Sequence, residues 1–357
     1  MTVLTTRELN RATLARQLLL GRADLDAWGA VSHLCGMQAQ EPQEPFTGLW
    51  SRLRDFAPAG LDGLVTGRRA VRVHLMRRTV HLVTSDDVLA WRSRHADMLR
   101  QKVLGVYRAD LAGVDLVELA AAGREVLAEG PASAAEVVRA LGGRWPSVAP
   151  RALGEMVIAA LVPVVQTPPR GLWRARGGVR NALLADWLGR EPDPPDDGDP
   201  VGRELVRRYL AAHGPASSGD LRMWSGLAGL PAAVAAVRGE LVSFRDERGR
   251  ELLDLPDAPR PDGDVPAPVR FLPAFDNAIL GYQDRSRIVD DAHKGLSVAG
   301  ERVVLVDGRV TATWRVAEDV VRVAPLRELT AGERDEVVAE GERLAGFLTG
   351  GDRVVVG

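Results

Sequence analysis

The stretch GPASAAE at residues 130–136 recurs as GPASSGD at residues 214–220. In the first copy Ser133 is followed three residues later by Glu136, and the second copy has an aspartate at the same spacing, as in a capping box at a helix start. A helix is expected before each copy, and two helices and a β-ribbon are expected after it. An internal repeat is stronger evidence of a fold than local propensity. It predicts two consecutive modules of helix, turn, two helices and ribbon.

The boundaries of these elements follow from apolar spacing and turn residues. The first copy has expected helices at 116–127, 135–141 and 151–161 with a ribbon at 162–166 and 171–175, and the second has helices at 205–212, 221–227 and 232–240 with a ribbon at 241–245 and 251–255. The N-terminal part repeats this order more loosely, with a β-ribbon at 70–83 and then a long helix at 85–103. Proline-rich linkers are expected at 191–200 and 256–268.

The C-terminal part has a different pattern. Asp307 and Gly308 are a strong turn signal between two β-branched runs, which predicts a hairpin. Thr330 and Glu333 predict the capped start of an amphipathic helix that ends near Leu348. The predicted fold class is therefore α+β, with three tandem winged helix-turn-helix modules and a small C-terminal α+β domain. The predicted domains are residues 1–108, 109–190, 198–256 and 268–357.

Length and composition indicate an ordinary multidomain globular protein. The chain has 357 residues, of which 46% are hydrophobic and 26% are charged, and it is too long for one core. No apolar run is long enough to span a bilayer, and the N-terminal sequence lacks the apolar core of a signal peptide, so we expect a cytoplasmic protein. The single cysteine, Cys35, excludes a disulfide within the chain and a thiolate zinc cluster.

The net charge of −2 is unevenly distributed. Residues 1–110 contain 16 basic and 11 acidic residues, whereas residues 191–357 contain 21 basic and 30 acidic residues. Every basic residue except Lys102 and Lys294 is an arginine, the better bidentate phosphate ligand. A positive field on the N-terminal part would suit nucleic acid, although an arginine-rich coding bias explains the composition equally well.

The segment MQAQ at residues 37–40 follows an apolar run and precedes a proline-containing segment, so Gln38 and Gln40 are expected in a loop. Loops held by rigid elements often carry catalytic side chains. A glutamine side chain has one acceptor oxygen and two amide donors and does not titrate near neutral pH. Two such groups can orient a water or a base edge but cannot remove a proton. Polar residues that cap a helix end are the alternative interpretation.

Four segments of the chain combine into a recognisable pattern. They are MQAQ at 37–40, LMRRTVHLV at 75–83, QTPPRGLW at 166–173 and FLPAFDNAILGYQDRSR at 271–287. Together they resemble the winged-helix DNA glycosylases of the AlkZ/YcaQ group over nearly the whole chain. The family's catalytic motif is Gln-x-Gln in AlkZ-like members and Gln-x-Asp in YcaQ-like members, so Gln38 and Gln40 indicate the AlkZ-like branch. The resemblance leads us to expect a glycine between Arg77 and Thr79, where this chain has Arg78.

The resemblance implies a concave, positively lined cleft for duplex DNA and the excision of alkylated purines. The implied substrate is N7-alkylguanine, with bulky adducts and interstrand crosslinks as further candidates. A purine alkylated at N7 is cationic and leaves as a neutral base, so the reaction needs no strong general acid, and the sugar passes through an oxocarbenium-like state. We expect Gln40 to hold the attacking water and Gln38 to support the water or the sugar.

A monofunctional hydrolase without metal or cofactor is expected. A bifunctional lyase needs an amine nucleophile, and neither Lys102 nor Lys294 lies in a recognisable site. The sequence contains no His-Glu-x-x-His motif and no pair of cysteines, which gives no support for a metal site. The expected partner is double-stranded DNA containing alkylated purines, and the protein is expected to be a monomer that binds no membrane.

Several side chains are candidates for DNA contact. Arg77, Thr79 and His81 come from the second family segment, Arg72 from the same predicted ribbon, and Trp173 and Arg174 from the second predicted wing. For the arginines a solvated strand position is the alternative, and for His81 a structural hydrogen bond. Phe46 and Trp50 are expected in a core rather than as wedges between bases. Asp276, Asp284 and Arg285 are expected in an ion-pair network that docks the last domain.

Two functions from other classes stay open at this point. Tandem winged helices also occur in sequence-specific DNA-binding regulators that have no chemistry, and a damage sensor could bind adducts without cutting them. A regulator would bind one DNA sequence preferentially, and this function would not use the MQAQ segment. A glycosylase predicts dependence on the lesion and little dependence on sequence.

Overall fold

The computed structural model describes residues 2–357. The first half of the described chain contains β1 (Val3–Leu4), α1 (Thr6–Arg16), α2 (Ala27–His33), β2 (Met37–Gln38), α3 (Glu44–Arg52), α4 (Pro58–Thr66), β3 (Ala70–His74), η1 (Met76–Arg78), β4 (Val80–Thr84), α5 (Ser85–Trp91), α6 (Ala96–Tyr107), α7 (Leu116–Ala128), α8 (Ala134–Leu141), α9 (Pro150–Met156), η2 (Val157–Leu161), β5 (Val164–Gln166), β6 (Asn181–Leu183) and α10 (Leu184–Leu188).

The second half is built in the same mixed way. It contains α11 (Pro200–His213), α12 (Ser218–Ser225), α13 (Leu230–Ala236), η3 (Arg238–Glu240), β7 (Val242–Asp246), β8 (Glu251–Asp254), β9 (Arg270–Leu272), α14 (Asn277–Leu280), η4 (Asp291–His293), α15 (Leu296–Ala299), β10 (Val303–Val306), β11 (Arg309–Ala317), β12 (Val320–Pro325), α16 (Ala331–Thr349) and β13 (Val354–Val356).

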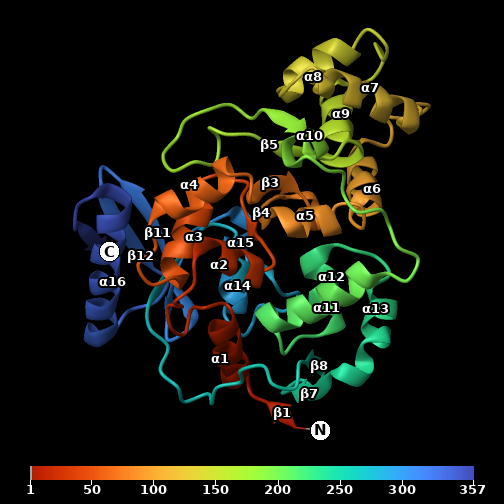
Figure 1. The fold of residues 1–357 in the computed structure, drawn as a ribbon. Helices are drawn as coiled ribbons and strands as arrows, with labels where there is room; N and C mark the ends of the chain where they lie inside the picture. Colours follow the sequence, from red (N-terminus) through yellow and green to blue (C-terminus); the bar gives the residue numbers. More distant parts are fainter. Residues whose placement is uncertain (1) are drawn as a thin grey trace.

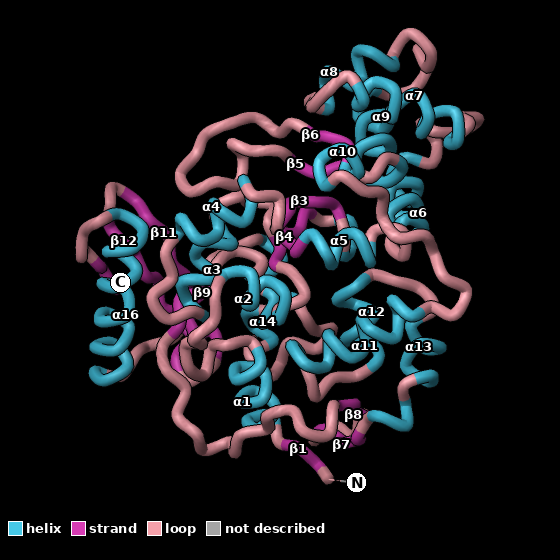
Figure 2. The backbone as a smooth tube through the Cα atoms, viewed as in Figure 1, coloured by secondary structure: helices cyan, strands magenta, loops and turns pink. Residues whose placement is uncertain are grey.

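The strands of residues 2–357 form three sheets among the helices, an α+β architecture. Helices α7 to α10 project as a lobe at the top of Figure 1, while α16 and the C-terminal sheet lie at the left side. Figure 2 shows the strands in separate groups with helices and long loops between them. The N-terminal strand β1 pairs in parallel with β7, so the start of the chain joins a ribbon more than half the sequence away.

One five-stranded sheet, with the order β2-β4-β3-β5-β6, carries the residues of the candidate site. Within it Val73 of β3 lies opposite His81 of β4, and Arg72 lies opposite Gln166 of β5. Two ribbons that the sequence predicted for separate modules therefore share one sheet. The pairing is decided by contacts between segments about 90 residues apart, which local sequence patterns do not encode.

The prediction of the second ribbon was wrong for one of its two strands. Its first strand is confirmed as β5, but its partner is β6 and not residues 171–175, which lie in a loop. Pro168 and Pro169 have no N–H group to donate to a ladder, so the chain leaves the sheet after Gln166. It returns to the sheet only at Asn181.

The predicted long helix at 85–103 was also wrong, because the chain forms α5 and α6 with a break between them. At the break, buried Arg92 donates to the carbonyl oxygen of Ala160. The imidazole of buried His95 is 2.8 Å from the carbonyl oxygen of Trp91. These tertiary and local bonds favour the broken backbone over a continuous helix, although the apolar spacing continues through the break.

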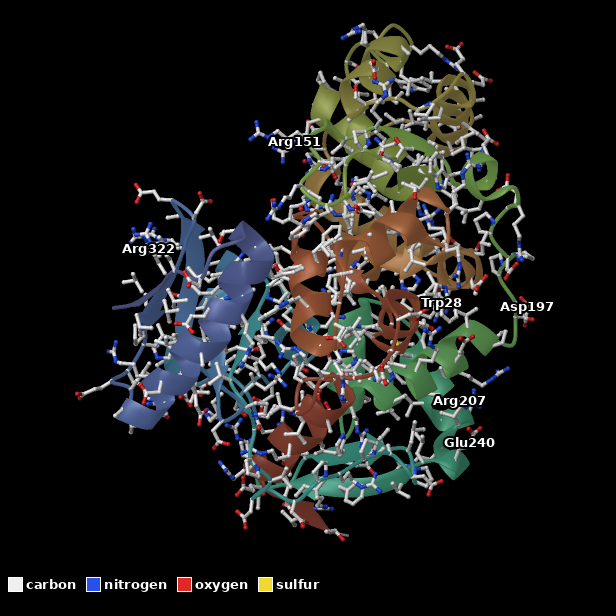
Figure 3. The ribbon with its side chains drawn as sticks, turned by 60° about the vertical axis from the view of Figure 1, so that its left-hand side comes forward. Trp28, Arg151, Asp197, Arg207, Glu240 and Arg322 are labelled. Atoms are coloured by element: carbon white, nitrogen blue, oxygen red, sulfur yellow. The ribbon has the colours of Figure 1, made fainter. Side chains whose placement is uncertain are left out.

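Other sequence predictions are confirmed. The predicted capping boxes close the starts of α8, α12 and α16. The third ribbon forms as β7 and β8, and the C-terminal hairpin forms as β10 and β11 around Asp307 and Gly308. Residues 191–199 and 255–269 contain no helix or strand, as expected for linkers. Asp197 lies on the first linker at the outer edge of the molecule in Figure 3.

Distant segments are joined by buried ion pairs. Arg52 of α3 makes a bidentate pair with Asp276, with nitrogen–oxygen distances of 2.7 and 2.9 Å, and both side chains are almost fully buried. Arg16 of α1 pairs in the same way with Asp254 of β8 at 2.6 and 2.8 Å. The expectation that Asp276 belongs to a docking network is confirmed. Asp284 also pairs, with Arg248 and Arg250.

No helix within residues 2–357 combines the length and apolar character needed to cross a membrane.

Asp276→Ala is expected to destabilise the protein strongly, because it leaves the guanidinium of Arg52 buried without its carboxylate. The free energy of unfolding should fall by about 3–5 kcal/mol, the usual effect of breaking a buried pair. Urea unfolding followed by circular dichroism measures the change. Asp97→Ala is the control, because Asp97 pairs with Arg100 on the surface and should contribute little. Equal stability of parent and Asp276→Ala would contradict the docking role.

Candidate active site

Gln38 and Gln40 lie at the edge of the five-stranded sheet. The expectation that both belong to a loop was wrong for Gln38, which is in the short strand β2 and lies opposite His81 of β4. Only Gln40 follows the strand and is exposed, whereas the side chain of Gln38 is largely buried. The strand pairing fixes the backbone of Gln38, while Gln40 extends towards solvent.

A chain of hydrogen bonds orients both amides. Nη2 of Arg77 donates to Oε1 of Gln38 over 2.9 Å, and Nε2 of Gln38 donates to Oε1 of Gln40 over 3.0 Å. Because a guanidinium only donates, the bond from Arg77 assigns the oxygen of Gln38 and therefore also its nitrogen. The oxygen of Gln40 keeps a second lone pair for another donor.

The backbone around MQAQ is held from both sides. Nδ2 of Asn277 donates to the carbonyl oxygen of Gly36 over 2.6 Å, and Nη2 of Arg72 donates to that of Ala39 over 2.6 Å. Gly36 has a φ of +86°, and a Cβ there would approach Cγ1 of Val83 to 2.5 Å, so only glycine fits. Sequence reasoning missed Asn277, although it lies in the family segment at 271–287.

Arg77 is fixed by a strained turn between β3 and β4. Arg77 and Arg78 have φ values of +56° and +67°, a region that costs a residue with a side chain roughly 1–2 kcal/mol. The expected glycine at position 78 matches this backbone, and here Arg78 adopts it while pairing with Glu155 at 2.8 Å. Nη1 of Arg77 donates to the carbonyl oxygen of Trp224 over 2.6 Å. The turn thus links the β2 edge to α12.

Burial lowers the pKa of Arg77 to about 10, with repulsion from Arg285 as a further cause. The guanidinium is still charged at neutral pH, because its pKa remains well above 7. The site therefore contains a fixed cation behind two neutral amides.

His81 lies beneath the site rather than on the surface of the protein, whereas Thr79 is partly buried. His81 is 1% exposed, its Nδ1 is 3.0 Å from the carbonyl oxygen of Thr79, and its Nε2 has no hydrogen-bond partner among residues 2–357. A carbonyl oxygen accepts, so Nδ1 carries the proton. Burial, with repulsion from Arg77 as a further cause, lowers the pKa of His81 to about 3. His81 is therefore neutral, and its position does not present it to a phosphate.

Arg72 is also inside the protein, at 2% exposure, where its bond to Ala39 supports the motif from below. Burial, with repulsion from Arg170 as a further cause, lowers its pKa to about 10. The structure thus places Arg72, like His81, as a support within the sheet and not at a surface available to DNA.

Trp173 and Arg174 lie in the loop of residues 167–180 that joins β5 to β6, and not on a strand of the ribbon. The ring of Trp173 contacts Phe46 and Phe347, with centroids 5.0 and 4.9 Å apart. Nη2 of the exposed Arg174 donates to the carbonyl oxygen of Leu348 over 2.7 Å. The loop that carries them therefore packs between α3 and the end of α16. The expected core position of Phe46 is confirmed by its complete burial.

Trp50 stacks on Phe347 with ring centroids 5.8 Å apart, which confirms a packing role for its ring. Within residues 2–357, no three or more histidine, cysteine, aspartate or glutamate side chains are grouped so that they could hold a metal ion.

A family model for AlkZ-like DNA glycosylases matches residues 31–347. The chain belongs to the AlkZ-like DNA glycosylase family. It is therefore an enzyme of DNA repair that acts on DNA, and the resemblance predicted from its four segments is confirmed. The solved structure of DNA glycosylase AlkZ from Streptomyces sahachiroi shares the fold with a TM-score of 0.78 and 20% sequence identity, and the match covers 100% of each chain. No curated protein sequence matches this chain.

Buried histidines should make this family member sensitive to mild acid. Burial lowers the pKa of His74 and His95 to about 4 and that of His81 and His213 to about 3, below the usual 6.5. Below pH 6.5 the histidines of the unfolded chain bind protons, whereas the buried rings of the folded protein stay neutral. The free energy of unfolding is therefore highest above pH 6.5 and falls as the pH decreases towards the folded pKa. In that window the free energy of unfolding should fall by up to about 1.4 kcal/mol per pH unit for each histidine.

Urea unfolding at pH 7.5, 6.5 and 5.5 measures this slope. His213→Asn removes one of the four groups and should make the slope shallower. A stability that does not change between pH 7.5 and 5.5 would contradict the neutral state of these rings.

Proposed function

We propose that this DNA glycosylase hydrolyses the N-glycosidic bond of purines alkylated at N7, with a water held by Gln40. The hydrogen-bond chain from Arg77 through Gln38 to Gln40 carries this proposal. It presents one oriented amide oxygen at an exposed position next to buried partners. Such preorganised dipoles lower a barrier without reorganisation during the reaction.

Gln40 is the residue that meets the water. Its oxygen already accepts from Gln38, and its remaining lone pair accepts a hydrogen bond from an O–H of the water, which turns a lone pair of the water towards C1′. As the bond from C1′ to the base breaks, the water oxygen bonds to C1′, and the extra proton of the added water passes to the solvent. Gln38 acts mainly through Gln40, because its oxygen is occupied by Arg77. Arg77 is a positioning residue that fixes the direction of both amides.

The substrate class follows from the charge of these groups. Neither glutamine can protonate a leaving base, and burial keeps His81 neutral through the physiological pH range. A base that already carries a positive charge needs no such proton, since it departs neutral. Purines alkylated at N7 have this property, so the site suits them and should act slowly on unmodified purines.

The finer architecture and the partner belong to the same proposal. Three winged helices with a C-terminal α+β domain, divided at residues 1–108, 109–190, 198–256 and 268–357, would place duplex DNA along a concave cleft. The helix pairs followed by the ribbons β3–β4, β5–β6 and β7–β8 support this arrangement. We propose that Thr79 lies close to the DNA with Arg174 further along, whereas Arg77, although expected from the sequence to contact DNA, positions the two amides. Arg72, His81 and Trp173 support the surface from inside. A cytoplasmic monomer that needs no cofactor is the expected form.

Gln40→Ala should reduce excision of N7-methylguanine from a duplex by roughly 100-fold or more, as removal of a single oriented hydrogen-bonding group does in other enzymes. Gln38→Ala should give a smaller loss, because it removes the orientation of Gln40 and not the contact with water. Alkali cleavage at abasic sites measures excision, and fluorescence anisotropy measures DNA binding. Binding should be retained in both variants.

Gln43→Ala is the matched control, since Gln43 lies three residues beyond Gln40 and bonds to the backbone of Leu172 and Arg174. Its excision rate should stay within a few-fold of the parent. If Gln40→Ala cuts as fast as the parent, the proposed mechanism is wrong. If the parent releases no base from N7-methyl, bulky or crosslinked substrates but prefers one DNA sequence, the function is that of a regulator.

Arg77→Lys should lower kcat by about 10–100-fold with little change in the Kd for DNA, because a lysine retains the charge but lacks the fork that reaches both Gln38 and Trp224. Single-turnover excision and anisotropy separate the two effects. Arg78→Lys, at the adjacent residue that pairs with Glu155, is the control and should leave kcat nearly unchanged. Equal losses of kcat and DNA affinity in Arg77→Lys would indicate phosphate contact instead of positioning.

A further inference from the structure

An open groove of about 990 Å³ lies where the turn between β7 and β8 meets the segment of residues 283–299. Its described lining contains four basic and two acidic side chains, those of Arg248, Arg250, Arg285, Lys294, Asp284 and Asp291. None of the four basic residues belongs to the candidate active site or to the DNA contacts predicted from the sequence. An excess of cations in a groove of this size suits a polyanion.

The two arginines of the turn are held in place by one carboxylate. Oδ2 of Asp284 accepts from Nη1 of Arg248 over 3.0 Å and from Nη2 of Arg250 over 2.6 Å. Arg250 is also paired with Asp246. Within residues 2–357, Arg248 uses only Nη1 of its guanidinium, and its side chain is 62% exposed. Its other N–H groups are therefore available to an anion in the groove.

Buried Asp220, in the first turn of α12, fixes the position of the groove relative to that helix. Its Oδ1 accepts from the backbone N–H of Gln283 over 2.9 Å, and its Oδ2 accepts from the backbone N–H of Ser217 over 2.9 Å. Gln283 and Ser217 both line the groove. The groove is therefore formed before a ligand arrives, and binding does not have to order it.

Helix α12 connects the groove with the candidate active site. Ser217 lies in the groove at the start of the helix, while Trp224 near its end accepts the hydrogen bond from Arg77. The eight residues of this helix span about 12 Å, or about three to four base pairs of DNA. Arg285 in the groove is also close enough to Arg77 to lower its pKa, after the larger effect of burial. The groove therefore adjoins the turn that orients the two glutamines.

The groove also presents apolar groups. Val298 of α15 is 69% exposed, and its neighbour Ala299 is exposed as well. A sugar–phosphate backbone alternates anionic phosphates with deoxyribose rings, whose C–H groups can pack on such side chains. Inorganic phosphate has no apolar part. The combination of cations and exposed apolar groups therefore suits the backbone of a nucleic acid.

We propose that this groove binds the sugar–phosphate backbone of DNA next to the active-site turn. Arg248, Arg285 and Lys294 contact phosphates, and Val298 packs against a deoxyribose. Asp284 and Arg250 act as positioning residues that hold Arg248. The inference rests on the family assignment, which makes DNA the substrate, and not on the water or the base proposed for Gln40.

Arg248→Gln tests the phosphate contact. Asp284 keeps its bonds from Arg250 and from the backbone N–H of Ser286, so the variant should fold normally. Its Kd for a short unmodified duplex, measured by fluorescence anisotropy, should rise about 3–10-fold near 0.15 M salt. The slope of log K against log salt should become shallower by about 1, the value for one lost phosphate contact. Arg248→Lys should keep the parental slope, because lysine also neutralises a phosphate.

Arg207→Gln is the matched control for charge. Arg207 pairs with Glu240 on the surface, as Figure 3 shows, and does not line the groove. The change in net charge is the same, but the Kd and the salt slope should stay close to those of the parent. An equal effect of Arg207→Gln and Arg248→Gln would assign the loss to the overall field and overturn the proposal.

Val298→Glu tests the groove from its apolar part. It places a carboxylate beside the expected phosphates and should weaken duplex binding about tenfold or more. Val355→Glu makes the same change at an exposed valine of β13 outside the groove and should bind like the parent. The proposal is overturned if Arg248→Gln and Val298→Glu, each with parental circular dichroism, keep the parental Kd and salt slope. Because the duplex is unmodified, these results do not depend on which base the enzyme excises.

Discussion

Guanidinium groups buried inside the protein hold distant parts of this chain together. Arg52 and Arg16, both from the first helices, reach carboxylates of Asp276 and Asp254 far along the sequence. A planar guanidinium matches a carboxylate with two parallel bonds, and burial makes each unpaired donor costly. The N-terminal helices are therefore not an independent unit, because their buried charges are completed by residues from the second half of the chain.

Guanidinium groups also hold the side chains and backbone of the candidate active site in place. Arg72 holds the carbonyl of Ala39, and Arg77 holds the oxygen of Gln38. Because the motif is fixed by buried donors, its two amides keep one orientation before any substrate arrives. The excess of basic residues near the N-terminus thus contributes less to a surface field than the sequence indicated, since Arg11, Arg16, Arg52, Arg72 and Arg92 are all buried.

An active site of neutral amides beside a fixed cation limits the chemistry. In the proposed mechanism the oxygen of Gln40 orients the water, while His81 is held neutral and neither amide is acidic enough to protonate a leaving base. This arrangement suits a leaving group that is activated before it binds. It also explains why Arg77 is held in a strained turn, because the strain places one guanidinium between Gln38 and Trp224.

Local signals in the sequence determined many elements, since capping boxes such as Thr330 with Glu333 and the turn at Asp307 and Gly308 depend on neighbouring residues alone. The four motif segments likewise determined the family. Tertiary structure alone decided that the edge strand with Gln38 pairs with β4, that residues 167–180 leave the sheet, and that Arg72 and His81 turn inward. Those outcomes depend on hydrogen bonds and burial between segments far apart, which no local pattern encodes.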